Sequence, residues 1–290
     1  MNPAQENLVI RAQGLSRRYG STVALDGVDL EIPAGRIVGL VGPNGAGKTT
    51  ALKAVLGLGP YDGRLEVLGL DPRRQRAELM RQVAFIADVA VLPRWLRVRQ
   101  ALDITAGLHP HFSRDKAETF LQQTEIKRDS RIGALSKGMV TQLHLALVMA
   151  IDARLLVLDE PTLGLDIIYR KEFYSALLND YFDGERTILL TTHQVEEVEH
   201  ILTDLVFISH GRIVLDESME TLGEKFVELA TRPDRADEAR ALGPLSERQG
   251  LGRHYFIFED RPREALASLG EIKVPGVADL FVAKVRRTRS

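Results

Sequence analysis

Residues 42–49, Gly-Pro-Asn-Gly-Ala-Gly-Lys-Thr, have types and a spacing that suit the binding of phosphate. Glycines let the backbone N–H groups of a loop turn inward around phosphate oxygens, and the N-terminus of a following helix adds partial positive charge. The loop lies between an apolar run at 37–41 and a helical pattern at 48–56, which is the strand–loop–helix context that this motif requires. A glycine-rich turn that contains Lys-Thr by chance is the alternative, and this context disfavours it.

The loop predicts specific contacts to a nucleotide and a metal ion. Lys48 is expected to reach the β- and γ-phosphates, and the Thr49 hydroxyl to ligate Mg²⁺. The other predicted nucleotide contacts belong to the same loop and the first helical turn: Gly42, Pro43, Asn44, Gly45, Ala46, Gly47 and Thr50.

Two carboxylates, Asp159 and Glu160, follow the apolar run at 155–158, where ligands bind at the carboxyl ends of strands in open α/β sheets. Adjacent strand residues point to opposite faces, so the two acids can have different roles. We expect Asp159 to hold Mg²⁺ through water and Glu160 to orient or deprotonate an attacking water. An Asp-Glu pair alone is more often an exposed turn, but the phosphate loop upstream favours the catalytic interpretation.

His193 directly follows the strand expected at 187–192. A lone histidine is more often structural than catalytic. Neighbouring parallel strands would nevertheless bring it to the same sheet edge as Asp159 and Glu160, where it could contact a γ-phosphate as a polar sensor.

The elements that position these residues form an alternation of strands and helices over residues 8–209, which predicts a parallel sheet covered by helices. Near-continuous apolar runs indicate strands buried on both faces, at 36–41, 155–158, 187–191 and 205–208. The run at 28–32 instead alternates apolar and polar residues, which predicts an antiparallel strand with one solvated face.

The pattern changes after residue 216. A charged helix is expected over 220–241, broken near Pro233, followed by strands at 255–258 and 280–283 with a helix at 262–269 between them. We therefore predict two domains, 1–217 and 218–290, the second a small α+β appendage.

Composition excludes several classes of protein. Lys and Arg number 38 and Asp and Glu 40 among 290 residues, so no nucleic acid partner is expected from the overall charge. Cysteine is absent, which removes disulfides, thiolate metal sites and cysteine nucleophiles. Neither a secretory signal nor a run of about 18 apolar residues is visible, so any membrane association is expected to come through a partner.

Residues 135–139, Leu-Ser-Lys-Gly-Met, lie between the phosphate loop and the acidic strand and precede a helical pattern. In isolation Ser136 would be an ordinary helix N-cap, although Ser136 and Gly138 could also form an anion site at a helix N-terminus. Together with the other motifs, this segment closely resembles the signature of ATP-binding subunits of ABC transporters. Tyr19 then corresponds to the aromatic that stacks on adenine, residues 163–166 to the loop after the acidic strand, and His193 to the switch histidine.

The resemblance covers residues 8–217 and implies a fold, cofactors and partners. The fold is a P-loop NTPase domain of the ABC type, with a mixed sheet, flanking helices and a helical subdomain. ATP and Mg²⁺ are the implied cofactors. Two copies, or one copy and a paralogous ATPase subunit, would close head-to-tail around two ATP molecules, with each phosphate loop facing the other copy's Ser136 and Gly138. An integral membrane permease on a separate chain would hold the subunit at the cytoplasmic face of the membrane.

Two departures from the family pattern stand out. The usual glutamine between the phosphate loop and the signature aligns with Asp88, an acid that could approach Mg²⁺ or its water. Lys137 and Met139 replace the more common glycine and glutamine, a form similar to the exporter-like branch with separately encoded permeases.

Other functional interpretations and segments remain open at this level. A soluble ABC-type ATPase acting on ribosomes or DNA is the main alternative, and a nucleotide-dependent regulatory module is a third. Trp95 and Leu96 either line the groove that receives a cytoplasmic loop of the permease or belong to a helix entry. His109 and His111 have a spacing that metals sometimes use, but a loop is the expectation. The basic tail at 284–289 either touches anionic lipid or is a solvated terminus.

Overall fold

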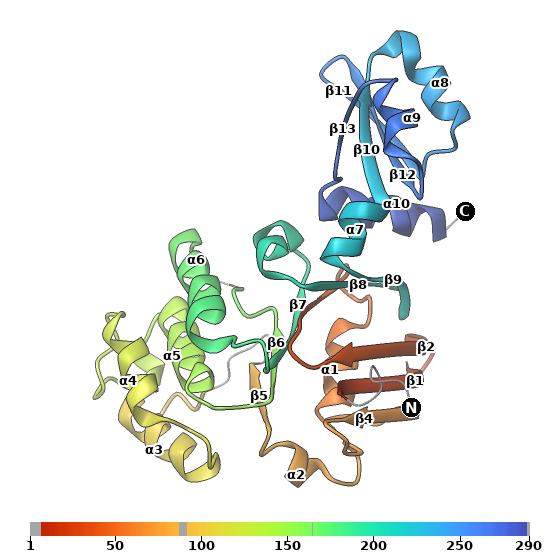
Figure 1. The fold of residues 1–290 in the computed structure, drawn as a ribbon. Coiled ribbons are helices and arrows are strands. Elements are labelled where there is room, and N and C mark those ends of the chain that lie inside the picture. Colours follow the sequence, from red (N-terminus) through yellow and green to blue (C-terminus); the bar gives the residue numbers. More distant parts are fainter. Residues whose placement is uncertain (1–6, 87–91, 164, 289–290) are drawn as a thin grey trace.

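The computed structural model describes residues 7–86, 92–163 and 165–288. A six-stranded sheet, in the order β5-β6-β7-β3-β8-β9, forms the centre of the larger part of the chain (Figure 1). Its members are β3 (Ile37–Val41), β5 (Val83–Ile86), β6 (Leu155–Asp159), β7 (Thr187–Thr192), β8 (Asp204–Ser209) and β9 (Arg212–Ser218). All neighbours pair in parallel except β8 and β9. Every residue of β3, β6 and β7 is buried, which explains their apolar sequences and confirms these predicted strands.

Alternate residues of the central strands enter two separate hydrophobic cores. Leu156 and Leu158 of β6 belong to the core that contains α5 (Lys137–Met149) and α6 (Ile167–Ala176). Leu155 and Val157 belong to the core that contains α1 (Lys48–Val55) and the antiparallel sheet. The parallel sheet is therefore covered on both faces, and its carboxyl edge is the part left open to a ligand.

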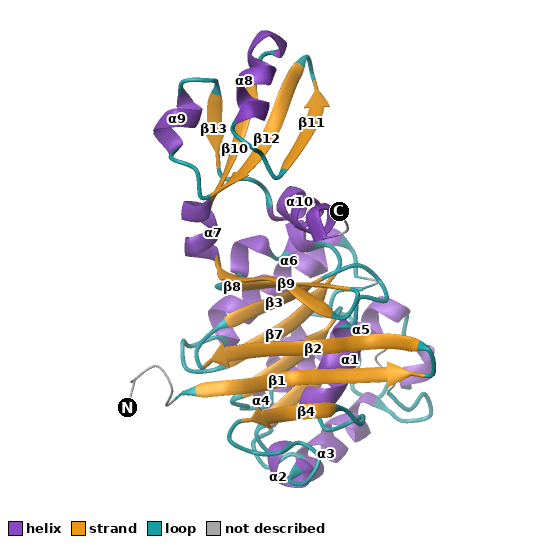
Figure 2. Cartoon of the chain, turned by 90° about the vertical axis from the view of Figure 1, so that its right-hand side faces the viewer, coloured by secondary structure: helices purple, strands orange, loops and turns teal. Residues whose placement is uncertain are grey.

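A three-stranded antiparallel sheet, in the order β2-β1-β4, lies beside the central sheet (Figure 2). It consists of β1 (Leu8–Tyr19), β2 (Thr22–Pro33) and β4 (Asp62–Val67), and α2 (Arg76–Leu79) follows it. From Val28 to Ile32 buried and exposed residues alternate, which confirms the predicted strand with one solvated face.

The helical subdomain has a hydrophobic core of its own. It is formed by α3 (Val98–Leu108), α4 (Arg114–Gln122) and α5, whose Leu102, Leu121 and Leu143 are buried together. Because α5 also contributes to the core beneath the central sheet, the subdomain is attached to the sheet through that helix.

The C-terminal part has a four-stranded antiparallel sheet in the order β11-β12-β10-β13. Its elements are β10 (Phe226–Thr231), α8 (Ala236–Ala241), β11 (Ser246–Gly250), β12 (Arg253–Glu259), α9 (Arg263–Ala267) and β13 (Glu271–Lys273). This β-α-β-β-α-β succession is the split βαβ arrangement of ferredoxin-like folds. The expected α+β class is correct, as are the strand at 255–258 and the helix near 262–269.

Two expectations for this part are wrong. The segment 220–241 is one short helix, α7 (Met219–Lys225), then strand β10, then α8, because Val227 and Leu229 are buried with period two against α8 and α9. Residues 280–283 lie inside α10 (Val277–Thr288) and do not form a strand. An apolar run of four residues does not distinguish the two states, whereas burial of Val277, Leu280 and Ala283 follows the helical period.

Helix α10 joins the C-terminal part to the larger one. The Phe281 ring meets Phe207 of β8 edge to face, with 4.9 Å between ring centroids. The same helix contacts β9 and the 3₁₀ turn η4 (Val195–Glu197), which begins two residues after His193. The rest of the four-stranded unit projects away from the larger part, as Figures 1 and 2 show.

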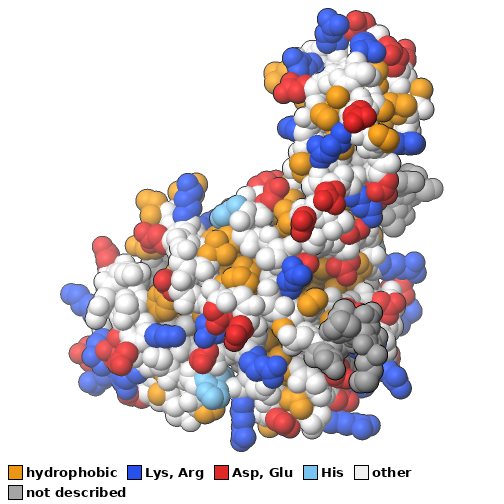
Figure 3. Space-filling view, in the orientation of Figure 1, with side chains coloured by type: hydrophobic (Ala, Val, Ile, Leu, Met, Phe, Trp, Pro, Cys, Tyr) orange, Lys and Arg blue, Asp and Glu red, His pale blue; other side chains and the backbone are white. Residues whose placement is uncertain are grey.

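Charges are mixed on the face drawn in Figure 3, where Lys and Arg side chains are interspersed with Asp and Glu. Among the described residues, no helix is both long and apolar enough to cross a membrane.

Candidate functional site

The phosphate loop connects β3 to α1, as its sequence predicts. Gly47 is the N-cap of α1, has φ of 113°, and a Cβ there would lie 2.4 Å from the carbonyl oxygen of Ala24. A Cβ on Gly42 would lie 2.3 Å from the carbonyl oxygen of Ile208. Both positions therefore require glycine. No side chain caps α1 and its first turn has no acid, so the N–H groups at this helix start remain suited to an anion.

The remaining loop residues differ in their exposure. Ala46 and Lys48 are buried, whereas the others lie at the surface or partly buried in the first turn of α1: Pro43, Asn44, Gly45, Thr49 and Thr50. The Thr49 hydroxyl is therefore in a position from which it could reach a metal ion bound to phosphate.

Lys48 lies between the phosphate loop and the acidic strand. Its Nζ donates to the carbonyl oxygens of Gly42 at 2.7 Å and Pro43 at 3.4 Å, and lies 3.5 Å from Glu160 Oε1. The side chain is 6% exposed, so its charge is poorly screened by water. A phosphate oxygen entering the loop would compete for this ammonium group.

Asp159 is 3% exposed at the end of β6, and its Oδ1 accepts a hydrogen bond of 2.6 Å from the Thr191 hydroxyl. The described part of the chain has no cluster of three or more His, Asp or Glu side chains that could hold a metal ion. The carboxylate of Asp159 and the hydroxyl of Thr49 nevertheless fit Mg²⁺, because proteins usually bind this ion through one or two oxygen ligands together with substrate phosphates and water. Asp159 and Thr49 would be those ligands.

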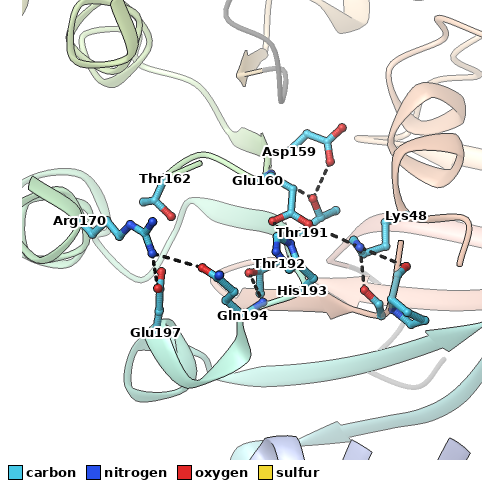
Figure 4. A network of polar contacts seen from close by, with 12 residues as sticks. Lys48, Asp159, Glu160, Thr162, Arg170, Thr191, Thr192, His193, Gln194 and Glu197 are labelled. Carbon is cyan, nitrogen blue, oxygen red and sulfur yellow. Dashed lines mark hydrogen bonds and ion pairs between the residues drawn. The ribbon is translucent and has the colours of Figure 1, made fainter. Parts of the chain in front are cut away.

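Glu160 has a left-handed backbone conformation, with φ of 47°, which is uncommon for a residue other than glycine. Its N–H donates to both the carbonyl and the hydroxyl oxygen of Thr191, each at 3.2 Å. The turn away from the β6 direction points its carboxylate toward Lys48 on one side and His193 on the other (Figure 4). Strain of this kind is typical of functional sites.

His193 Nδ1 lies 2.9 Å from Glu160 Oε2. The two residues come from neighbouring parallel strands in which Asp159 pairs with Thr191, so both follow their strands at the same sheet edge. The predicted convergence of Asp159, Glu160 and His193 is correct, and Lys48 reaches the same place from the phosphate loop.

The predicted signature residues lie elsewhere. Ser136 is the N-cap of α5, and its Oγ accepts from the backbone N–H of Met139 at 3.2 Å. A cavity of about 320 Å³ is lined by Ser136, Gly138, Asp166, Tyr169 and other residues, none of them from the phosphate loop. Ser136 and Gly138 therefore line a cavity to which this chain's own phosphate loop contributes no residue.

Tyr19 is at the end of β1, opposite Thr22 in the β1–β2 hairpin, and 48% of it is exposed. The Arg17 guanidinium lies 4.6 Å from the centre of its ring. The same hairpin carries Ala24 on β2, which faces Gly47 of the phosphate loop, so an exposed aromatic ring is available on the hairpin adjoining the loop.

The remaining predictions have different outcomes. Asp88 and Gly164 lie outside the described residues. Leu96 is 5% exposed within the helical core and so does not line a groove, whereas Trp95 is 73% exposed. Residues 109–111 lie outside regular secondary structure, as expected.

Several residues that contact this site were missed from sequence. Thr191 binds both Asp159 and the backbone of Glu160. Arg170 binds the segments that follow Glu160 and His193, and Gln194 and Glu197 are its partners. Thr191 has a recognisable signal, a hydroxyl in an apolar strand beside an acidic one, whereas the contacts of Arg170 have none.

A glycine-rich loop between a strand and a helix, with two acids at the end of another parallel strand of the same sheet, defines a P-loop nucleoside triphosphatase. The family model for ABC transporters matches residues 25–163. Nod factor export ATP-binding protein I of Burkholderia thailandensis is 34% identical over 89% of this chain and 88% of its own length. Daunorubicin resistance ATP-binding protein DrrA2 of Streptomyces coeruleorubidus is 35% identical over 75% of this chain and 69% of its own.

The chain belongs to the family of ABC transporter ATP-binding subunits, and its predicted resemblance to them is confirmed. It binds ATP and is an ATPase. A solved ATP-binding subunit of an ABC transporter superposes with a TM-score of 0.68 at 25% identity, covering 74% of this chain and 92% of that one. A nucleotide-free ATP-binding cassette, 19% identical with a TM-score of 0.63 over 75% of this chain and 94% of that one, shares the fold.

Proposed function

We propose that this chain is the ATP-hydrolysing subunit of an exporter and that it drives a membrane permease encoded separately. The observation that carries the proposal is the Glu160 carboxylate, which lies between Lys48 at 3.5 Å and His193 at 2.9 Å at the open edge of the sheet. The names of the relatives, which refer to Nod factor export and daunorubicin resistance, support outward transport. Neither name identifies the cargo of this chain.

In the proposed mechanism the phosphate loop binds the triphosphate, and Lys48 turns from Glu160 toward the β- and γ-phosphate oxygens. Mg²⁺, held by Thr49 and Asp159, would neutralise charge on the phosphates. Glu160 orients a water molecule for attack on the γ-phosphorus and accepts its proton as the bond to the bridging β–γ oxygen breaks. His193 orients Glu160 and contacts the γ-phosphate, and ADP and phosphate are the products.

Head-to-tail dimerisation would complete the site. Ser136 and Gly138 lie at the start of α5, a helix N-terminus that could face the phosphates held by another subunit. Ile167 and Ile168, 71% and 65% exposed, begin α6 directly after Asp166, and apolar side chains at this position suit a protein contact. A second copy or a paralogous ATPase subunit would supply the opposite surface.

The permease would bind beside the helical subdomain and hold the subunit at the cytoplasmic face of the membrane. Trp95, exposed just before α3, is the proposed contact, since large aromatic side chains are enriched at protein interfaces. We propose residues 1–217 as the ATPase domain and 218–290 as an accessory domain. The four-stranded sheet that begins at β10 supports this division.

Affinity isolation of the tagged chain from detergent-solubilised native membranes, with mass spectrometry of its companions, tests the proposal. A multi-span membrane protein in stoichiometric amount is the expected result. Recovery with ribosomes, with DNA or without any partner would instead support the soluble ATPase. A parallel isolation of a Trp95→Ala variant tests the docking contact, which would be rejected if the permease were recovered in unchanged amount.

A further inference from the structure

Arg170 of α6 binds three groups on two other segments, and Figure 4 shows its contacts to Gln194 and Glu197. Its Nε donates to the carbonyl oxygen of Leu165 at 2.9 Å. Its Nη1 donates to Gln194 Oε1 at 3.2 Å and forms an ion pair with Glu197. One guanidinium group therefore connects the loop that precedes α6 with the turn η4.

One of these segments follows Glu160 and the other follows His193. Two backbone hydrogen bonds lie between Glu160 and Leu165: Leu163 N donates to Glu160 O at 3.1 Å, and Leu165 N donates to Thr162 O at 3.0 Å. Burial raises the pKa of Tyr174 to about 12, so its hydroxyl stays protonated and is hydrogen-bonded to Thr162 at 3.1 Å. Hydrogen bonds therefore connect the described residues between Glu160 and the Arg170 contact at Leu165.

The second segment starts at His193. Gln194 is its direct neighbour, and the Gln194 N–H donates to Thr192 Oγ1 at 2.9 Å. Its side-chain oxygen is the one that accepts from Arg170. Any shift of Arg170 along α6 would thus be transmitted to the backbone on the C-terminal side of His193.

Arginine chemistry suits this connection. A guanidinium group presents donors in a rigid planar fork, so Nε and Nη1 can serve acceptors on two segments at once, which a lysine ammonium on a flexible stem does not reproduce. The side chains of Arg170 and Glu197 are 25% and 32% exposed, so their ion pair is partly shielded from solvent. The carboxylate of Asp166 caps α6 by accepting from Ile168 N and Tyr169 N, which fixes the helix that carries Arg170.

We propose that Arg170 is a positioning residue for ATP hydrolysis. Its hydrogen bonds to described residues go to Leu165, Gln194 and Glu197, which lie outside the phosphate loop and the Glu160–His193 pair. Arg170 acts by fixing the segments that follow Glu160 and His193, so that Glu160 Oε2 and His193 Nδ1 stay within hydrogen-bond distance. The inference rests on the proposed roles of Glu160 and His193.

The test compares Arg170→Ala, Arg170→Lys and Glu197→Gln in steady-state ATP hydrolysis, with ATP affinity and thermal stability measured separately. Loss of geometry at a reacting pair reduces rate without weakening substrate binding, so kcat of Arg170→Ala should fall about ten- to a hundredfold while Kd for ATP stays within about twofold. Arg170→Lys should retain the ion pair but lose the Leu165 contact, and so be intermediate. A double variant of Arg170→Ala with Glu197→Gln should be little slower than Arg170→Ala alone.

Arg186 provides a matched control. It is 20% exposed and likewise binds a backbone oxygen, that of Tyr181 at 2.6 Å, and two acids, Asp152 at 2.6 Å and Asp183 at 3.4 Å. These contacts lie before β7, at the opposite end of the strand from His193. Arg186→Ala should lower the melting temperature as much as Arg170→Ala does but leave kcat per folded protein unchanged.

The proposal would be overturned if Arg170→Ala and Arg170→Lys kept the wild-type kcat, or if Arg186→Ala reduced kcat equally. If Arg170→Ala does not fold, Glu197→Gln replaces it in the test, because this variant removes the charge of the ion pair and keeps the shape of the side chain. If instead the proposed role of Glu160 is wrong, the result is different: Glu160→Gln would hydrolyse ATP as fast as the wild-type chain.

Discussion

The hydroxyl group of Thr191 donates a hydrogen bond of 2.6 Å to Oδ1 of Asp159, and Thr191 Oγ1 in turn accepts one of 3.2 Å from the backbone N–H of Glu160. Thr191 is completely buried in β7, between β6 and β3. A single side chain of the neighbouring strand therefore orients the proposed metal ligand and the backbone of the proposed catalytic base.

Replacement of Thr191 by valine keeps the side-chain shape and removes the hydroxyl group. Leaving a buried carboxylate oxygen without its donor costs about 1–3 kcal/mol. We expect a lower kcat and a higher Mg²⁺ concentration for half-maximal ATP hydrolysis, both measured by steady-state assay. Thr231→Val is the control, because that hydroxyl is equally buried and donates to Leu269 O at 2.7 Å in the accessory domain. A similar kinetic loss in both variants would contradict the assignment.

Glu160→Gln preserves size and removes the charge that would accept a proton. ATP binding should remain, while hydrolysis should fall by about a hundredfold or more, the usual contribution of a general base. Filter binding of labelled ATP and single-turnover hydrolysis measure the two effects separately. Undiminished hydrolysis would remove Glu160 from its proposed role.

Phe281→Ala should loosen the accessory domain from the ATPase domain. Truncation of a fully buried phenylalanine to alanine lowers the free energy of unfolding by about 3–5 kcal/mol. Because Phe281 is only partly buried, we expect a decrease of about 2 kcal/mol in urea unfolding. Limited proteolysis should become faster near α7, which joins the two parts. Leu251→Ala, at a position that is 98% exposed, is the control and should change neither measurement. Equal proteolysis of both variants would argue against docking through Phe281.

His144 of α5 should make the protein sensitive to acid. Burial lowers the pKa of its imidazole from 6.5 to about 4, so the folded state binds fewer protons than the unfolded state between these values. This contribution to stability is present above pH 6.5 and is lost as pH falls toward 4, by about 3 kcal/mol. His144→Leu should flatten that part of the stability profile in denaturant unfolding at several pH values. His200→Leu, at an exposed position, should leave it unchanged, and an unaltered slope in His144→Leu would refute the explanation.

The nucleotide loop and the acidic strand end were predictable because their chemistry is local. Gly47 needs its left-handed backbone, and Lys48 follows it at the helix start, within a few residues of one another. Leu155 to Leu158 are buried on both faces, so their apolar run identifies the strand that ends in Asp159. Parallel pairing then places His193 at the same edge without further information.

The C-terminal part was harder to predict because short apolar runs are ambiguous. Residues 280–283 resemble a strand in isolation, and only packing of Leu280 and Ala283 with the sheet and of Phe281 with Phe207 makes them helical. Strand β10 was likewise not predicted, because the charged Glu228 interrupts its apolar residues. The side chain of Glu228 is 1% exposed and lies 3.3 Å from Lys273 and 3.5 Å from Arg248. Partners from other strands make that buried charge tolerable, and they do not appear in the local pattern.

By itself, therefore, the sequence determined the identities and order of the groups that bind and cleave a nucleotide, because backbone conformation and strand burial depend on neighbouring residues. The tertiary structure decided which distant groups hold them in place. Arg170 meets Glu197 across 27 positions and Thr191 meets Asp159 across 32. Such contacts depend on how α6, η4 and the central strands pack together, because hydrogen bonds require distances near 3 Å that residue types and spacing do not specify.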